Sequence, residues 1–289
     1  MTLLALLQTS TLAFTLLAAV LGLIVGSFLN VVIHRTPIVL MRHWRRDCLE
    51  FAGQPLDTEG EKYNLLRPRS RCPQCNHAIS ALENIPVVSF LWLRGKCSAC
   101  HKAISPRYPL IELLSAALAA TTAWHFGFGV TAFAAMALSW VLIALAVIDI
   151  DHQLLPDVMV LPFLWAGLLL NLFSVFTPLP SAVIGAVAGY LSLWLVFHLF
   201  KLITGKEGMG YGDFKLLALF GAWLGWQSLP LIILASSLLG ALIGIGLIVF
   251  RGQDRAKPMP FGPYLAAAGW VAMLWGDEIM RSYLQIARL

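Results

Sequence analysis

Charged residues are scarce in this sequence and make up only 12% of its 289 positions. Soluble globular proteins carry about a quarter charged residues, so this chain cannot cover a core of its size with a polar surface. No Asp, Glu, Lys or Arg precedes Arg35. Hydrophobic residues reach 59%, with a mean hydropathy of +0.78, which excludes disorder. The composition therefore predicts an integral membrane protein.

Several common catalytic patterns are also missing. The sequence contains no Gly-x-Ser-x-Gly, no His-Glu-x-x-His and no P-loop. Glycines 208, 210 and 212 do not complete a dinucleotide-binding fingerprint. Nucleic-acid binding is not predicted either, because membrane orientation and anionic lipid explain the basic residues. No internal repeat is evident.

Apolar segments occur eight times along the chain at lengths that suit membrane spans. A spanning helix needs about 20 mostly apolar residues. The candidate spans lie near Leu12–Ile33, Leu110–Phe126, Val130–Ile148, Val158–Phe176, Ser181–Phe200, Leu216–Leu229, Leu231–Phe250 and Phe261–Trp275. The sixth is short and ends at Pro230, so we expect it to be tilted or to enter the bilayer only partly. The predicted fold class is thus an all-α polytopic membrane protein.

The basic residues predict how these spans are oriented. Of 20 Lys and Arg residues, 12 fall between Arg35 and Arg107, beside 6 acidic residues, so this segment has a net charge of +6. By the positive-inside rule, this segment is cytoplasmic and both termini lie on the opposite side. Six further basic residues then also fall in cytoplasmic loops: Lys201, Lys206, Lys215, Arg251, Arg255 and Lys257.

Four cysteines in the basic segment predict a metal site. Cys72 and Cys75 form one C-x-x-C turn, and Cys97 and Cys100 form another. Four thiolates at this spacing can surround one tetrahedral zinc ion, which is structural because no coordination position stays open. The neighbouring histidines, His77 and His101, are either alternative ligands or solvated surface residues. Cys48 has no partner in this pattern.

Two aspartates near the ends of predicted spans are candidate catalytic residues. Asp149 ends the third span, and Asp213 follows Gly210 and Gly212 at the start of the sixth. Carboxylates at membrane depth are costly and point to function. Two that meet in a poorly solvated site share one proton and can activate water against a peptide carbonyl. The alternative, interfacial charges at helix ends, stays open and applies more strongly to Asp151 and Asp157.

Two other functions remain alternatives at this point. In a prenyl-phosphate transferase, cytoplasmic aspartates such as Asp149 and Asp151 hold magnesium against a diphosphate. In a proton-coupled transporter, Asp149 and Asp213 carry protons. The first needs paired Asp-Asp clusters with basic clamps, and the second needs polar residues along the spans. The sequence offers little of either.

The motifs together resemble those of the bacterial type IV prepilin leader peptidases, of the Gly-x-Gly-Asp class of intramembrane aspartyl proteases. The resemblance covers nearly the whole chain. It rests on the two cysteine turns and on Gly26-Ser-Phe-Leu-Asn30-Val-Val with Arg35, Glu83-Asn-Ile-Pro86, Arg107-Tyr-Pro-Leu-Ile-Glu112, Asp149-Ile-Asp-His-Gln-Leu-Leu-Pro-Asp157, Gly210-Tyr-Gly-Asp213-Phe-Lys215 and Pro260-Phe-Gly-Pro263.

The resemblance implies an enzyme of the bacterial inner membrane with two activities. Asp149 and Asp213 match the family's catalytic aspartates. The expected reaction removes the basic leader from type IV prepilins and from the pseudopilins of type II secretion. The enzyme then methylates the new N-terminal residue, usually phenylalanine, with S-adenosylmethionine. The residues that bind S-adenosylmethionine are not identified. Glu83 or Glu112 is expected to help hold the basic leader.

These patterns divide the chain into three parts. Residues 1–34 form the first span, residues 35–108 the cytoplasmic zinc-binding segment, and residues 109–289 a seven-span membrane domain with the protease site. The expected partners are prepilin and pseudopilin substrates and the lipid bilayer.

Overall fold

The computed structural model describes residues 2–54, 63–206, 208–251 and 259–287. Arg255 and Lys257, two of the basic residues predicted to lie in cytoplasmic loops, are outside these ranges. The described residues are mainly helical, with two isolated β-bridges in the cysteine-containing segment between α2 and α4. The helices are α1 (Leu3–Thr9), α2 (Thr11–Phe51), α3 (Val88–Trp92), α4 (Arg107–Phe126), α5 (Val130–His152), α6 (Asp157–Asn171), α7 (Leu179–Thr204), α8 (Tyr211–Leu224), α9 (Leu229–Arg251) and α10 (Gly262–Ala287), with 3₁₀ turns at Leu82–Asn84 and Trp226–Ser228.

Four helical segments are long and apolar enough to cross a membrane: Thr11–Phe51, Val130–His152, Leu179–Thr204 and Trp226–Phe250. The predicted class, an all-α multi-pass membrane protein, is therefore confirmed. The count of eight spans stays a prediction. The chain divides into two compact units, Met1–Ala144 and Leu145–Leu289.

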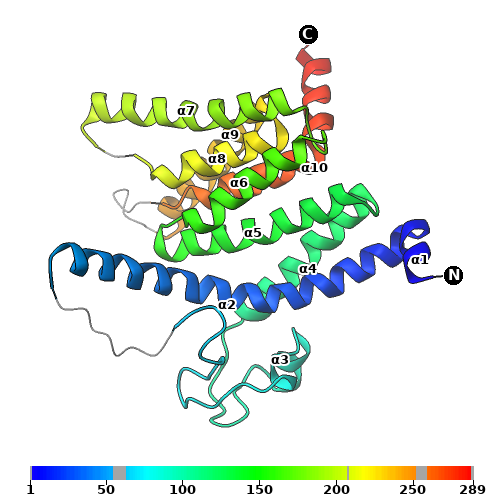
Figure 1. The fold of residues 1–289 in the computed structure, drawn as a ribbon, viewed down its shortest axis with the longest axis vertical. Coiled ribbons are helices and arrows are strands. Elements are labelled where there is room, and N and C mark those ends of the chain that lie inside the picture. Colours follow the sequence, from blue (N-terminus) through cyan, green and yellow to red (C-terminus); the bar gives the residue numbers. More distant parts are fainter. Residues whose placement is uncertain (1, 55–62, 207, 252–258, 288–289) are drawn as a thin grey trace. The chain divides into compact units, whose positions relative to one another are not determined.

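In the first unit, α2 and α4 pack along one another (Figure 1). Gly22 and Gly26 make the contact close: a Cβ at Gly22 would lie 2.6 Å from the Ala116 Cα. Ser115 Oγ donates a hydrogen bond of 2.6 Å to the Gly22 carbonyl. Small residues are what allow helix backbones to approach in lipid. The helix α2 does not end near Ile33, where the first span was predicted to end, but continues to Phe51 as one 41-residue helix.

In the second unit, α8 is surrounded by α6, α7 and α10 (Figure 1). Its side chains are buried from Leu216 to Trp223. With 14 residues, α8 is about 21 Å long, shorter than the roughly 30 Å of a hydrocarbon core. The helix begins at Tyr211 and ends at Leu224, five residues earlier at each end than the predicted sixth span. Pro230 does not end it, because Pro230 lies in the first turn of α9.

One buried asparagine accounts for two helix ends in this unit. Asn171 donates from its side-chain amide to the carbonyls of Ala222 and Trp223, at 2.9 Å each. Its side-chain oxygen accepts from the backbone N–H groups of Phe176 and Thr177. It thereby satisfies the last carbonyls of α8 and the turn that follows α6. The fourth predicted span, which was expected to reach Phe176, therefore ends as a helix at Asn171.

Candidate active site and metal centre

Asp149 lies in the last turn of α5 with only 6% of its surface exposed. Its Oδ2 accepts a hydrogen bond of 2.9 Å from the backbone N–H of Gly262, at the start of α10. Helical periodicity separates it from its neighbours: Ile148 is buried, whereas Ile150 and Asp151 are exposed. The sequence Ile-Asp-Ile-Asp thus turns one carboxylate into the unit and the other outward.

Asp213 lies in the first turn of α8 and is also 6% exposed. Its Oδ2 accepts from the backbone N–H of Gly210, over 3.3 Å. This bond satisfies one of the N–H groups near the helix start, where a carboxylate is favoured by the helix dipole. The backbone of the glycine-rich sequence before α8 therefore fixes the position of the Asp213 carboxylate.

The second unit brings the two aspartates into one neighbourhood. Asp213 interacts electrostatically with Asp149. Leu155, which is buried, packs against both of the adjoining glycines: a Cβ at Gly212 would lie 2.8 Å from the Leu155 Cβ, and one at Gly262 would lie 3.2 Å from its Cδ2. A side chain at either glycine would push these segments apart. Neither Leu155 nor Gly262 was predicted from the sequence to have a role of its own.

The other two aspartates of the motif are placed differently. Asp157, at the start of α6, forms an ion pair in which Lys215 Nζ lies 2.7 Å from both carboxylate oxygens. This pair connects the first turn of α6 to the fifth residue of α8. Asp151 is exposed, and it lies about half a turn around α5 from Asp149. Neither residue replaces Asp149 beside Gly262.

A pocket of about 280 Å³ adjoins the segments that hold the aspartates. Residues 208–209 line it and directly precede Gly210, which binds Asp213. Residues 259–261 line it and directly precede Gly262, which binds Asp149. The helix α9 contributes small side chains, and among the residues that the structure describes, no charged one lines this pocket. The pocket thus offers an apolar surface next to two carboxylates.

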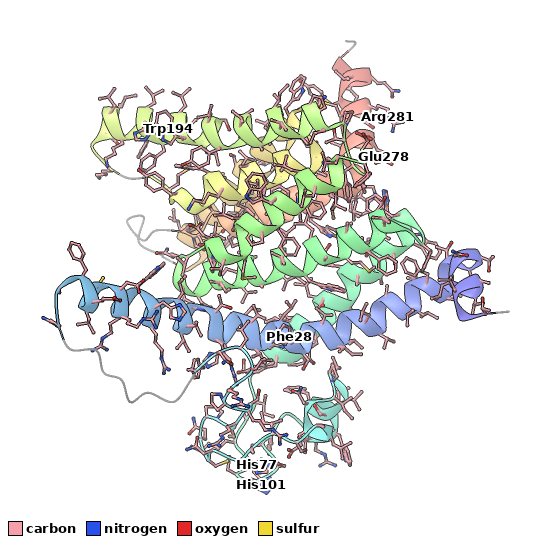
Figure 2. The ribbon with its side chains drawn as sticks, viewed as in Figure 1. Phe28, His77, His101, Trp194, Glu278 and Arg281 are labelled. Atoms are coloured by element: carbon pink, nitrogen blue, oxygen red, sulfur yellow. The ribbon has the colours of Figure 1, made fainter. Side chains whose placement is uncertain are left out.

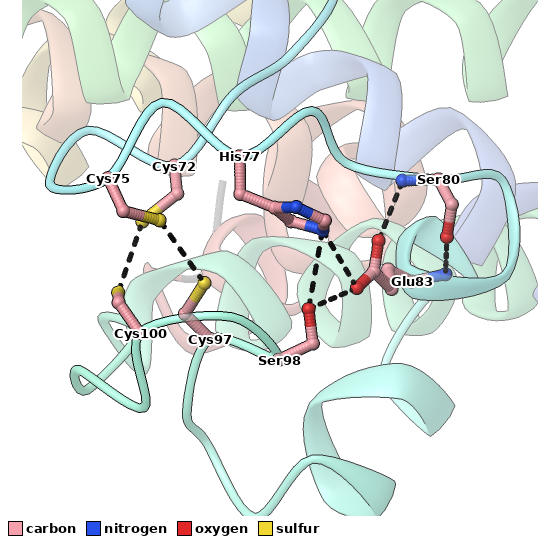
Figure 3. Close-up of polar contacts among 8 residues, drawn as sticks. All are labelled: Cys72, Cys75, His77, Ser80, Glu83, Cys97, Ser98 and Cys100. Atoms are coloured by element: carbon pink, nitrogen blue, oxygen red, sulfur yellow. Dashed lines mark hydrogen bonds and ion pairs between the residues drawn. The ribbon is translucent and has the colours of Figure 1, made fainter.

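In the first unit, the four predicted metal ligands lie together (Figure 3). Their sulfur atoms are all within 4.8 Å of one another, with 3.9 Å between Cys72 and Cys100 and 4.0 Å between Cys75 and Cys97. A tetrahedral site with zinc–sulfur bonds of about 2.3 Å has sulfur atoms about 3.8 Å apart. The arrangement fits one zinc ion. Cys48 is exposed on α2, outside this group.

The two cysteine turns are copies of one another, so the expectation that the chain lacks an internal repeat is wrong. Residues 71–80 read Arg-Cys-Pro-Gln-Cys-Asn-His-Ala-Ile-Ser, and residues 96–105 read Lys-Cys-Ser-Ala-Cys-His-Lys-Ala-Ile-Ser. In each copy the first cysteine N–H donates, over 2.9 Å, to the carbonyl five residues later. The residue after the second cysteine, Asn76 or His101, has a φ near +58° or +57°. The repeat places two sulfur pairs around one point.

The remaining residues singled out from the sequence have other partners. Both histidines lie in the cysteine segment (Figure 2), and the His77 ring contacts Glu83 and Ser98 rather than a sulfur atom. Glu112, on α4, is only 8% exposed. Its Oε2 accepts a hydrogen bond of 2.7 Å from the backbone N–H of Val87. Glu83 and Glu112, the two expected contacts for a basic leader, are thus already hydrogen-bonded within the first unit.

In comparisons with known proteins, the cysteine site and the aspartate site fall in regions that match two different family models. The model of the bacterial peptidase A24 N-terminal domain matches residues 20–126, which include the four cysteines. The model of the type IV leader peptidase family matches residues 136–245, which include both aspartates. A prepilin leader peptidase/N-methyltransferase of Stutzerimonas stutzeri is 58% identical over 98% of each chain. The chain belongs to the type IV leader peptidase family.

Other members of the family are similarly close. The prepilin leader peptidase/N-methyltransferase of Pseudomonas aeruginosa is 57% identical over 99% of both chains. That of Aeromonas salmonicida is 58% identical over 91% of both. No solved structure matches the chain significantly.

Proposed function

We propose that this protein is a prepilin leader peptidase and N-methyltransferase, as its relatives are named. Its substrates are type IV prepilins and the pseudopilins of type II secretion. The observation that carries the proposal is the pair of buried carboxylates, Asp149 and Asp213, inside the region that matches the leader peptidase family. Asp149 and Asp213 are the catalytic residues of this proposal.

The proposed cleavage needs no covalent intermediate. One aspartate is ionised and takes a proton from water, whose oxygen adds to the scissile carbonyl carbon. The other is protonated and gives its proton to the carbonyl oxygen. The carbon–nitrogen bond then breaks as the amine leaves with a proton from the dyad. Hydrogen bonds from Gly262 and Gly210 hold the two carboxylates for this exchange.

The pocket next to the aspartates supports an extended substrate at this place. The described residues that line it are mainly apolar, which suits the apolar segment that follows the scissile bond. In the proposed orientation, the aspartates face the cytoplasmic side of the bacterial inner membrane, where the leader is held. Both termini are then periplasmic. The three-part division at residues 34 and 108 belongs to the same proposal.

The proposal includes the methyl transfer but names no residues that bind S-adenosylmethionine. S-adenosylmethionine supplies the methyl group that is transferred to the new N-terminal amine. Zinc, held by Cys72, Cys75, Cys97 and Cys100, has a structural role, because a closed four-thiolate site leaves no position for substrate. Small segments with little core gain folding free energy from such a metal.

The proposal is tested by mixing the purified protein in detergent with a synthetic prepilin and S-adenosylmethionine. Mass spectrometry of the product is expected to show loss of the leader and one added methyl group at the new N-terminus. An intact prepilin after prolonged incubation, with added Mg²⁺ making no difference, contradicts the peptidase. Magnesium-dependent activity on a prenyl diphosphate would instead favour the transferase alternative.

A further inference from the structure

The side chain of Glu83 connects the two cysteine turns through contacts with residues other than the cysteines (Figure 3). Its Oε1 accepts a hydrogen bond from the Ser98 hydroxyl and lies 3.4 Å from His77 Nε2. Its Oε2 accepts from the backbone N–H of Ser80, over 2.8 Å. Ser98 Oγ also lies 3.4 Å from the same His77 nitrogen. We call Glu83, Ser98 and His77 the Glu83 clasp.

The clasp joins the same two turns that the metal joins. His77 follows Cys75 by two residues, and Ser98 directly follows Cys97. The sulfur atoms of these two cysteines are 4.0 Å apart. The hydrogen bonds from Ser98 and Ser80 also lower the pKa of Glu83 to about 2, so the carboxylate accepts them as an anion, which makes each bond stronger than a neutral one.

The internal repeat shows that the clasp is not a by-product of the cysteine turn itself. The position of Ser98 in the second copy corresponds to Pro73 in the first, which has no hydroxyl. The position of His77 in the first copy corresponds to Lys102 in the second. The two turns therefore share their backbone hydrogen bonds but not these side chains. Lys102 supplies a matched position at which a substitution leaves the clasp intact.

We propose that the Glu83 clasp positions the two cysteine turns for zinc, with Glu83, Ser98 and His77 as positioning residues that do not bind the metal. The proposal rests on the zinc site of the proposed function. Because the clasp holds the turns at the separation the four thiolates need, less conformational entropy is lost when the metal binds. Partners of this kind typically contribute about 10- to 100-fold in metal affinity.

The test uses the full-length protein in detergent with cobalt in place of zinc. Its thiolate-to-cobalt absorption reports a tetrahedral four-sulfur site, and a chelator titration gives the affinity. Ser98→Ala and Glu83→Gln are expected to lower the affinity about 10- to 100-fold without moving the absorption bands. Ser98→Thr, which keeps the hydroxyl, and Lys102→Gln are expected to stay within about twofold of the wild type.

Each outcome separates the clasp from the metal site. Affinities of Ser98→Ala and Glu83→Gln within twofold of the wild type overturn the clasp and leave the zinc site standing. Shifted absorption bands in Glu83→Gln also overturn it, because they make Glu83 a ligand. A wild-type protein without the four-sulfur spectrum overturns the zinc site itself. Loss of affinity in Ser98→Ala that Ser98→Thr does not restore indicates misfolding and contradicts the specific role of the hydroxyl.

Discussion

The backbone N–H of Gly262 donates a 2.9 Å hydrogen bond to the carboxylate of Asp149, 113 residues earlier in the chain. This bond fixes the end of α5 to the start of α10 beside the proposed dyad. It also explains why residue 262 is glycine, because a Cβ there would lie 2.7 Å from Asp149 Oδ2. The start of α10 therefore positions a proposed catalytic group.

Gly262→Ala is predicted to lower kcat for leader cleavage by about 10- to 100-fold, because small displacements of a reacting group are costly. The added methyl must move Asp149 or the start of α10. Steady-state cleavage of a prepilin measures the effect. Gly276→Ala is the matched control on the same helix, since its Cβ would come no closer than 3.8 Å to another side chain. Equal rates for the two variants would contradict the positioning role.

The Asp157–Lys215 ion pair is predicted to contribute little to stability. Both side chains are partly exposed, at 51% for Asp157 and 28% for Lys215, and exposed pairs typically contribute about 0.2–1 kcal/mol. Asp157→Asn and Lys215→Met are expected to lower the free energy of unfolding by no more than this. Thermal unfolding in detergent, with the double variant completing the cycle, gives the coupling energy. Complete loss of cleavage in Asp157→Asn, with normal stability, would assign Asp157 a chemical role instead.

The contact between α2 and α4 is predicted to tolerate no side chain at Gly22. A valine there must displace the α4 backbone at Ala116, and overpacking of this kind costs about 1–3 kcal/mol. The expected result is a lower unfolding temperature for Gly22→Val. Gly246→Val, on α9, has open space around the new side chain and is expected to behave like the wild type. Similar unfolding of the two variants would show that the close approach is not needed.

Zinc content is predicted to depend on the four grouped cysteines and not on the fifth. Cys100→Ser removes one of the four sulfur ligands and is expected to reduce bound zinc from about one ion per chain to a small fraction. Cys48→Ser is expected to retain it, because Cys48 is exposed on α2. Elemental analysis of the purified proteins decides the matter. Equal zinc in both variants would remove Cys100 from the site.

Much of this architecture follows from patterns that a single sequence displays. Apolar length located the helices, and the spacing of cysteines predicted the sulfur group that the structure contains. Helix ends were less predictable, because they depend on contacts between distant segments. The end of α8 and the turn after α6 are both set by Asn171, and hydropathy gives no sign of such a bond.

The residues around the proposed dyad show the same limit. Asp149 and Asp213 are conspicuous as charges near apolar segments, so the sequence identified them as candidates. Leu155 and Gly262 matter only through packing that the fold creates. The repeat of residues 71–80 and 96–105 is present in the sequence, but differences between the two copies obscured it. The clasp uses two of these differences, Ser98 in place of Pro73 and His77 in place of Lys102.

If Asp149 and Asp213 act together in cleavage, replacing either carboxylate with an amide stops leader removal. Wild type, Asp149→Asn and Asp213→Asn are each incubated with a prepilin and, separately, with a pre-cleaved pilin and S-adenosylmethionine. Mass spectrometry is predicted to show no leader removal by either variant, while both still methylate the pre-cleaved pilin. Cleavage at the wild-type rate by either variant would contradict the dyad.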